Sequence, residues 1–304
     1  MSATSLGLMA SALFAPLLLA QTLPHGLHAS APEQAAAIDV IAVEPDRARR
    51  MTVPVTLGDR GPFRFLVDTG AQNTVISDVL AERMALVPKA KATVIGVAGS
   101  QVVDTVTIDE IVMGRRSYYG LVAPILDSSH IGADGIVGLD GLQGQRVLLD
   151  FRRNLMLVDD ARALGTDRGF EIVVTARRRS GQLIMTNALI DGVRVDVVID
   201  TGAETSIGNR ALQRALSRRG NALPEELTSV TGQKIKADIG LGRRLELGGV
   251  TFTNVKLAYA DSPAFPALAL EHWPAVLLGM AQLRLFERVA IDFSSRKVMF
   301  DTDW

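Results

Sequence analysis

The sequence predicts an all-β protein built from two similar halves. Two segments, 63–77 and 195–208, read FRFLVDTGAQNTVIS and VDVVIDTGAETSIG, and in each an apolar, β-branched run leads directly into Asp-Thr-Gly-Ala. Strand-like runs are separated by glycine-rich or polar turns, as at 58–61, 180–181 and 191–192. The 27 glycines and the aromatic content of 5% suit a chain with many turns. These features indicate strand after strand, with one copy of the motif in each half.

The duplication extends beyond the two motifs, and a repeat of this length defines the architecture. Asp68 and Asp200 are 132 positions apart. After each aspartate, two patterns follow in the same order. The first is an apolar run containing a glycine, GIVGL at 135–139 and VLLGM at 276–280. The second is a triplet ending in Asp-Phe, LDF at 149–151 and IDF at 291–293. We therefore expect an N-terminal lobe at 51–160 and a C-terminal lobe at 161–304, which begins with a polar connector at 161–169.

Composition points to carboxylates as the catalytic groups. The chain has no cysteine, which excludes disulfides, thiol nucleophiles and cysteine-ligated metal sites. Outside the N-terminal segment only His130 and His272 remain, too few for a three-histidine zinc site. We therefore expect neither a metal nor a cofactor. The formal net charge is -1, from 32 basic and 33 acidic residues, and this balance argues against a nucleic-acid partner.

Short helices are expected directly after each Asp-Thr-Gly motif. The stretches 77–84 and 209–218 fit such helices, with Ser77 and Asn209 as N-caps. Three arginines at 177–179, just before a Ser-Gly turn, are expected to form a solvated hairpin tip.

The N-terminal segment 1–30 is predicted to be a signal peptide or an anchor, followed by a linker at 31–50. Residues 6–20 read LGLMASALFAPLLLA, an apolar run too short to span a bilayer comfortably but suited to a secretory signal. Cleavage after Ala20 or Ala29 fits the small residues there. We expect a periplasmic or secreted protein, with membrane attachment only if the leader stays uncleaved. An intracellular protein is the alternative if this segment is not a signal.

The paired motifs and the segments after them resemble the aspartic proteases of the pepsin and retropepsin superfamily. Asp-Thr-Gly-Ala is the retroviral form of the motif, and DGIVG at 134–138 is similar to the corresponding pepsin-type segment. The resemblance covers nearly all of the chain after the leader, and bacterial exported proteins of this duplicated, retropepsin-like kind are known. It implies a two-lobed acid protease fold, a catalytic dyad of Asp68 and Asp200, and a peptide or protein substrate. It also implies that Thr69 and Thr201 hydrogen-bond across the lobe interface.

Paired aspartates suit peptide hydrolysis without a metal or a covalent intermediate. Two carboxyls a few ångströms apart cannot both ionise easily, so they share one proton. One takes a proton from water, and the other gives one to the substrate. Gly70 and Gly202 let the chain turn tightly beside the carboxyls. Because both motifs lie on one chain, we expect an active monomer.

Each lobe is also expected to carry a hairpin, with tips at 97–100 and 230–233. By the resemblance, such hairpins act as flaps that cover the substrate and donate backbone hydrogen bonds, through the tip residues Ala98, Gly99, Thr231 and Gly232. Plain surface turns are the alternative.

An inactive peptide-binding protein on the same fold is the second interpretation of the whole chain. A glycosidase also uses two carboxylates, but at a wider spacing and without paired Asp-Thr-Gly turns.

Overall fold

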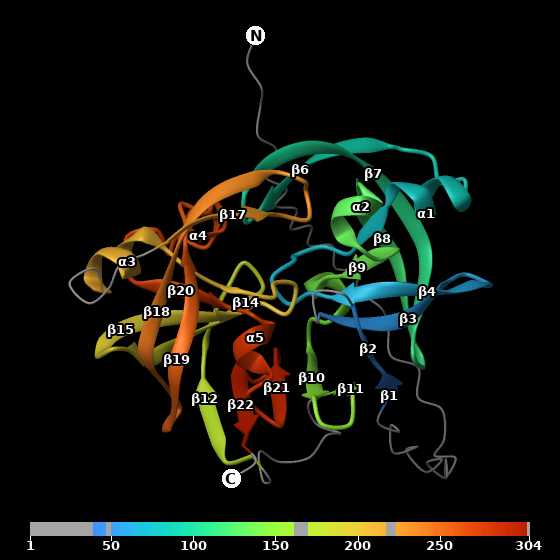
Figure 1. Ribbon diagram of the computed structural model, residues 1–304. Coiled ribbons are helices and arrows are strands. Elements are labelled where there is room, and N and C mark those ends of the chain that lie inside the picture. The colour runs from blue at the N-terminus through green and yellow to red at the C-terminus, as the bar shows by residue number, and fades with distance from the viewer. Residues whose placement is uncertain (1–38, 47–49, 161–169, 217–222, 303–304) are drawn as a thin grey trace, which may run out of the picture. The chain divides into compact units, whose positions relative to one another are not determined.

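The computed structural model describes residues 39–46, 50–160, 170–216 and 223–302. Within these ranges the chain is mostly β-strand with few short helices, in two sheet-rich lobes (Figure 1), which confirms the predicted fold class. No helix among the described residues is long and apolar enough to cross a membrane. The predicted leader, 1–30, and the connector, 161–169, lie outside the described residues.

The N-terminal lobe is built on an eight-stranded sheet, in the order β2-β3-β4-β9-β5-β8-β7-β6. Near its centre β4 runs parallel to β9, and β5 runs parallel to β8. Its strands are β2 (Glu44–Pro45), β3 (Met51–Leu57), β4 (Arg60–Val67), β5 (Val75–Ser77), β6 (Ala90–Gly96), β7 (Gly99–Met113), β8 (Arg116–Leu126) and β9 (Gly135–Val137). Its short helices are α1 (Asp78–Arg83), α2 (Ser128–Ile131) and the 3-10 helix η1 (Leu139–Gly141).

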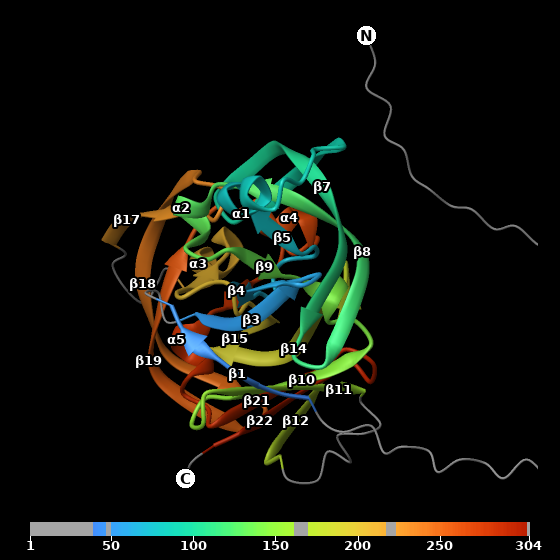
Figure 2. The ribbon, with the colours of Figure 1, turned by 90° about the vertical axis from the view of Figure 1, so that its right-hand side faces the viewer.

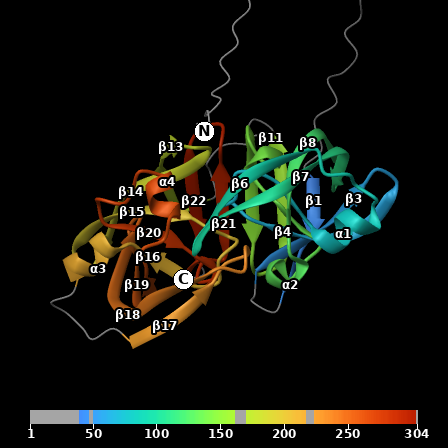
Figure 3. The same cartoon turned by 90° about the horizontal axis from the view of Figure 1, so that it is seen from above.

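The C-terminal lobe repeats this arrangement in a sheet of the order β13-β14-β15-β20-β16-β19-β18-β17. Here β15 runs parallel to β20, and β16 runs parallel to β19. Its strands are β13 (Arg177–Arg179), β14 (Gln182–Ile190), β15 (Val193–Ile199), β16 (Ser206–Gly208), β17 (Leu223–Thr228), β18 (Lys234–Leu247), β19 (Val250–Tyr259) and β20 (Ala275–Leu278). Its helices are α3 (Arg210–Leu216), α4 (Ala264–Ala267) and α5 (Met280–Leu283). Figure 3 shows the strands of the two lobes side by side.

A six-stranded sheet joins the lobes, in the order β1-β11-β10-β21-β22-β12. Its strands are β1 (Asp39–Ala42), β10 (Gln145–Asp150), β11 (Leu155–Asp160), β12 (Ile172–Thr175), β21 (Arg288–Asp292) and β22 (Lys297–Asp301). At its centre β10 of the first repeat pairs antiparallel with β21 of the second. In Figures 1 and 2 this sheet lies below the two lobe sheets. One hydrophobic cluster includes residues of both lobes and of the joining sheet, such as Phe65, Leu149 and Val197.

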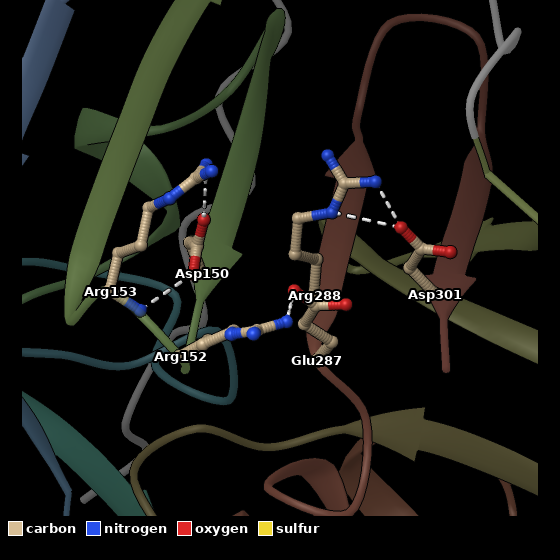
Figure 4. A network of polar contacts seen from close by, with 6 residues as sticks. All are labelled: Asp150, Arg152, Arg153, Glu287, Arg288 and Asp301. Carbon is tan, nitrogen blue, oxygen red and sulfur yellow. Dashed lines mark hydrogen bonds and ion pairs between the residues drawn. The ribbon is translucent and has the colours of Figure 1, made fainter. Parts of the chain in front are cut away.

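Charged side chains also cross the lobe boundary at this sheet. Arg146 on β10 and Asp292 on β21 form a buried ion pair at 2.7 Å. Separating the two lobes here would leave an uncompensated buried charge, so this ion pair holds β10 and β21 together. Figure 4 shows a second, more exposed group of ion pairs. Arg152 and Glu287 pair across the lobe boundary at 3.1 Å. Two further pairs lie within one lobe each, Arg153–Asp150 at 3.4 Å and Arg288–Asp301.

The segment expected to be a linker, 31–50, contains two strands of the fold. β1 pairs with β11 and β2 pairs with β3, and Ile41 on β1 is buried. β1 and β12 form the two edges of the joining sheet. Each is the first described strand of its repeat, so the repeated unit begins near Asp39 rather than at Met51. This corrects the expectation of a linker for the residues of β1 and β2.

The expected helices begin at their capping residues. Ser77 Oγ accepts from Leu80 N at 3.1 Å at the start of α1, and Asn209 Oδ1 accepts from Leu212 N at 2.8 Å at the start of α3. The turns at 180–181 and 191–192 join antiparallel strands, and all four of their residues have positive φ. Two successive positive φ values suit a tight hairpin, which explains the glycine at each second position. The arginines of β13 are exposed, as expected.

Candidate active site

Asp68 and Asp200 stand at equivalent points, each directly after a strand in the middle of its lobe sheet. Asp68 follows β4, and its N–H donates to Val137 O at 3.1 Å. Asp200 follows β15, and its N–H donates to Leu278 O at 3.0 Å. Val137 and Leu278 belong to the two glycine-containing apolar runs that repeat in the sequence. Those runs therefore fix the backbone of the two aspartates.

Thr69 and Thr201 hold the two aspartate loops together across the lobe boundary. Thr69 Oγ1 donates to Ile199 O at 2.8 Å, and Thr201 Oγ1 donates to Val67 O at 2.7 Å. Each hydroxyl also accepts from the backbone N–H of the other threonine, at 3.3 Å for Thr69 Oγ1 and 3.0 Å for Thr201 Oγ1. Both side chains are buried, so losing either hydroxyl would leave buried polar groups without partners.

Gly70 and Gly202 are required by the close approach of the opposite carboxyls. Asp68 Oδ1 accepts from the backbone N–H groups of Gly70 and Ala71, at 2.7 and 3.1 Å. In the other loop Asp200 Oδ1 accepts from those of Gly202 and Ala203, both at 3.1 Å. A Cβ on Gly70 would lie 2.9 Å from Asp200 Oδ1, and a Cβ on Gly202 would collide with Asp68. Each carboxyl therefore lies against the glycine of the opposite loop, which brings the two carboxyls close together.

This environment raises the pKa of both aspartates. Burial raises the pKa of Asp200 to about 7, and the neighbouring charge of Asp68 adds to the rise. Burial also raises the pKa of Asp68, against the hydrogen bonds of its own loop. The charge of Arg50 acts in the opposite sense and lowers the pKa of both carboxyls. A pair with such pKa values keeps one proton over an acidic range, as acid–base catalysis by two carboxyls requires.

A cleft of about 580 Å³ contains the dyad and is lined by both lobes. This is an ordinary size for a ligand site. Much of its wall is apolar, and apolar side chains come from both lobes: Val94, Leu126, Ile136, Leu227, Leu268 and Leu277. Among the described residues no group of three or more His, Cys, Asp or Glu is placed to hold a metal ion.

The two expected hairpins are present as β6–β7 and β17–β18, and their tips lie against each other. Gln233 Nε2 donates to Ser100 O at 2.9 Å, which links the two tips. The Gln233 side chain fills the space beside Gly99, and the His130 ring fills the space beside Gly232. The cleft is lined by 92–97 and 227–230 of these hairpins, and not by the four residues expected there: Ala98, Gly99, Thr231 and Gly232.

Arg50 and Gln182 are among the residues of the cleft wall that sequence reasoning missed. Each lies 18 positions before the aspartate of its repeat. Gln182 Nε2 donates to Gly70 O at 2.5 Å, across the lobe boundary. Arg50 stays in its own lobe, where Nη2 donates to Ile131 O at 2.7 Å. Aligning the repeats upstream of the two aspartates would have found this pair of positions.

The two lobe sheets, the joining sheet and the paired Asp-Thr-Gly loops define a two-lobed aspartyl protease fold. A family model described as aspartyl protease matches residues 53–140 and 186–281, one segment in each lobe, and each segment contains one of the two aspartates. The chain belongs to the aspartyl protease family, which supports a peptidase of the hydrolase class in general. No match was found among curated proteins.

Proposed function

We propose that this chain is a retropepsin-like aspartic endopeptidase, which hydrolyses peptide bonds with a water molecule activated between Asp68 and Asp200. The observation that carries the proposal is the reciprocal packing of the two loops. Each carboxyl packs against the glycine of the opposite loop, and the two threonines bond each loop to the other. A binding role alone gives no reason for two closely packed acids with raised pKa values at one point.

The surroundings of the two acids favour distinct roles. The Gly202 N–H stabilises the charge of Asp68 in addition to the donors of its own loop, so Asp68 is assigned the negative charge and Asp200 the proton. Asp68 takes a proton from water while the water oxygen bonds to the peptide carbonyl carbon, and Asp200 gives its proton to the carbonyl oxygen. The C–N bond of the tetrahedral intermediate then breaks. The amine leaves with the proton held by Asp68, and the reforming carbonyl returns its proton to Asp200.

The substrate is an extended segment of a peptide or protein. A cleft between two lobes that is rimmed by β-hairpins suits a strand-like peptide, whose backbone can pair with hairpin backbone. The apolar walls suit apolar side chains on both sides of the bond that is cleaved. Both halves of the dyad are supplied by one chain, which supports activity as a monomer.

The apolar segment at 6–20 supports export, so periplasmic or secreted proteins are the proposed source of substrate. N-terminal sequencing of the protein recovered from the cell exterior or periplasm tests this, and recovery only from the cytoplasm would contradict it.

Cleavage of a denatured protein mixture, with the products identified by mass spectrometry, tests the proposed activity. The wild-type chain should cleave, and Asp68→Asn and Asp200→Asn should each lower kcat by more than about a hundredfold, because the two acids act as a unit. Asp59→Asn makes the same chemical change at an exposed turn and should cleave like wild type. A well-folded wild-type chain that binds peptides without cleaving them would instead be an inactive peptide-binding protein.

A further inference from the structure

Arg50 and Gln182 occupy the same position in the two repeats, each opposite the aspartate of its own lobe. Thr52 on β3 pairs with Leu66 on β4, and Ile184 on β14 pairs with Val198 on β15. Continued by two residues, these registers set Arg50 opposite Asp68 and Gln182 opposite Asp200. Directly opposed residues on antiparallel strands are close neighbours on one face. The first repeat therefore places a cation beside its aspartate, where the second places a neutral amide.

The guanidinium of Arg50 is fixed and shielded from water. Its side chain is 11% exposed, and that of its partner Asp46 is 4% exposed. Arg50 Nε donates to Asp46 Oδ2 at 2.8 Å, Nη2 donates to Ile131 O, and the backbone N–H donates to Asp46 Oδ1 at 2.7 Å. An arginine stays charged at every pH where a protein is folded. In such a buried place its charge acts over a longer distance than it would in water.

Apart from the two aspartates, Arg50 is the least solvated of the titratable side chains that line the cleft. The other titratable side chains that line the cleft with it are the two aspartates, His130 and Glu204. Glu204 is exposed, and the His130 side chain is 37% exposed and lies 3.8 Å from Asp127. Solvent screens both of these groups more than it screens Arg50. Arg50 lines the cleft and its partner Asp46 does not, so the cation is the member of this ion pair that borders the cleft containing the dyad.

We propose, on the basis of the proposed endopeptidase function, that Arg50 is a positioning residue for the charge of the dyad: its cation moves the pH range in which the acid pair is singly ionised to lower pH, and Asp46 limits how strongly the pair experiences that cation. Arg50 does not touch the reacting atoms in this account. It acts through Asp68 and Asp200, whose pKa values its charge lowers. Gln182, at the same position of the other repeat, carries no charge and braces the Asp68 loop through Gly70 O.

Two variants that break the same ion pair distinguish this role from a structural one. Arg50→Gln removes the cation, so both limbs of the pH profile of kcat/KM should move up by about half a unit or more. Asp46→Asn leaves the cation uncompensated, so both limbs should move down. If the ion pair were only structural, both variants should lower kcat/KM alike, and the limbs of the pH profile should not move in opposite directions. Arg50→Lys keeps the charge and should keep the limbs near those of wild type.

Gln182→Met is the matched control, because it changes the equivalent position of the other lobe without changing charge. It should leave the limbs in place even if it lowers the rate. Shifts in the same direction for Arg50→Gln and Asp46→Asn, or an equal shift in Gln182→Met, would overturn the proposal. If Arg50→Gln does not fold, Asp46→Asn decides: a downward shift supports the proposal and an unmoved profile overturns it.

Titration of ¹³C-labelled aspartate carboxyl carbons by NMR gives the same answer without turnover, with Asp68→Asn and Asp200→Asn used to assign the two signals. If the wild-type chain cleaves no peptide, the proposed function fails while this titration still tests Arg50. If the chain cleaves peptides and the carboxyl signals titrate alike in all variants, only the Arg50 proposal fails.

Discussion

The two lobes support their aspartates in the same way but place different side chains around them. The Gly138 N–H donates to Thr74 Oγ1 at 3.3 Å in the first lobe, and the Gly279 N–H donates to Ser206 Oγ at 2.9 Å in the second. Each hydroxyl then bonds a different side chain, Asp140 in the first case and Gln282 in the second. The equivalent positions opposite the acids are Arg50 and Gln182. The duplication has thus kept the backbone framework that holds the acids and varied the groups that set their charge.

The largest effect is expected where a carboxyl packs on the opposite glycine. Gly202→Ala sets a methyl group against Asp68, and Gly70→Ala sets one 2.9 Å from Asp200 Oδ1. A displacement of about 1 Å in a catalytic group can cost about a hundredfold in rate. We expect Gly202→Ala to lose at least that much kcat/KM and Gly70→Ala to lose less, because its contact is looser. Near wild-type kinetics in Gly202→Ala would show that the acids do not lie as described.

A second comparison sets the two faces of β1 against each other. Ile41 is 3% exposed and packs in the core, whereas its neighbour Val40 is 56% exposed. Ile41→Ala should lower the free energy of unfolding by about 2–5 kcal/mol, because it opens a cavity. Val40→Ala should change it by less than about 0.5 kcal/mol. Urea unfolding of both variants measures this, and equal values would mean that β1 is not part of the folded core.

Thr69 and Thr201 should contribute about equally to the stability of the contact between the two lobes. Thr69→Val and Thr201→Val each remove a buried hydroxyl and leave a carbonyl oxygen of the other lobe unpaired, at a cost of about 1–3 kcal/mol in unfolding free energy. The double variant should cost less than the sum, because the two residues share one network. Melting temperatures that stay at the wild-type value in both single variants would exclude a bridge between the lobes.

The dyad, its threonines and glycines, and the two hairpins could be predicted from the sequence, because each depends on a local pattern that occurs twice. The positions of Gln182 and Arg50 repeat in the sequence, but their roles could not be predicted, because these depend on register and on contacts such as Gln182 with Gly70, 112 positions away. β1 was missed for a similar reason: it is four residues long, and Asp39 pairs with Val158. The hairpin tips were located correctly in the sequence, but only the structure shows that the tips contact each other and that Ala98, Gly99, Thr231 and Gly232 do not line the cleft.

In the proposed function, Asp68 and Asp200 share one proton and hydrolyse peptides with it. The most direct measurement is the pH profile of kcat/KM on a soluble peptide. The pKa of Asp200 is raised to about 7, so its proton, and with it activity, should be lost as the pH rises through about 7. Activity should also fall at low pH, where Asp68 becomes protonated and can no longer accept a proton from water. The pH profile of kcat/KM should therefore be bell-shaped, with an optimum at roughly pH 4–6. A maximum near pH 2, or activity undiminished above about pH 8, would contradict it.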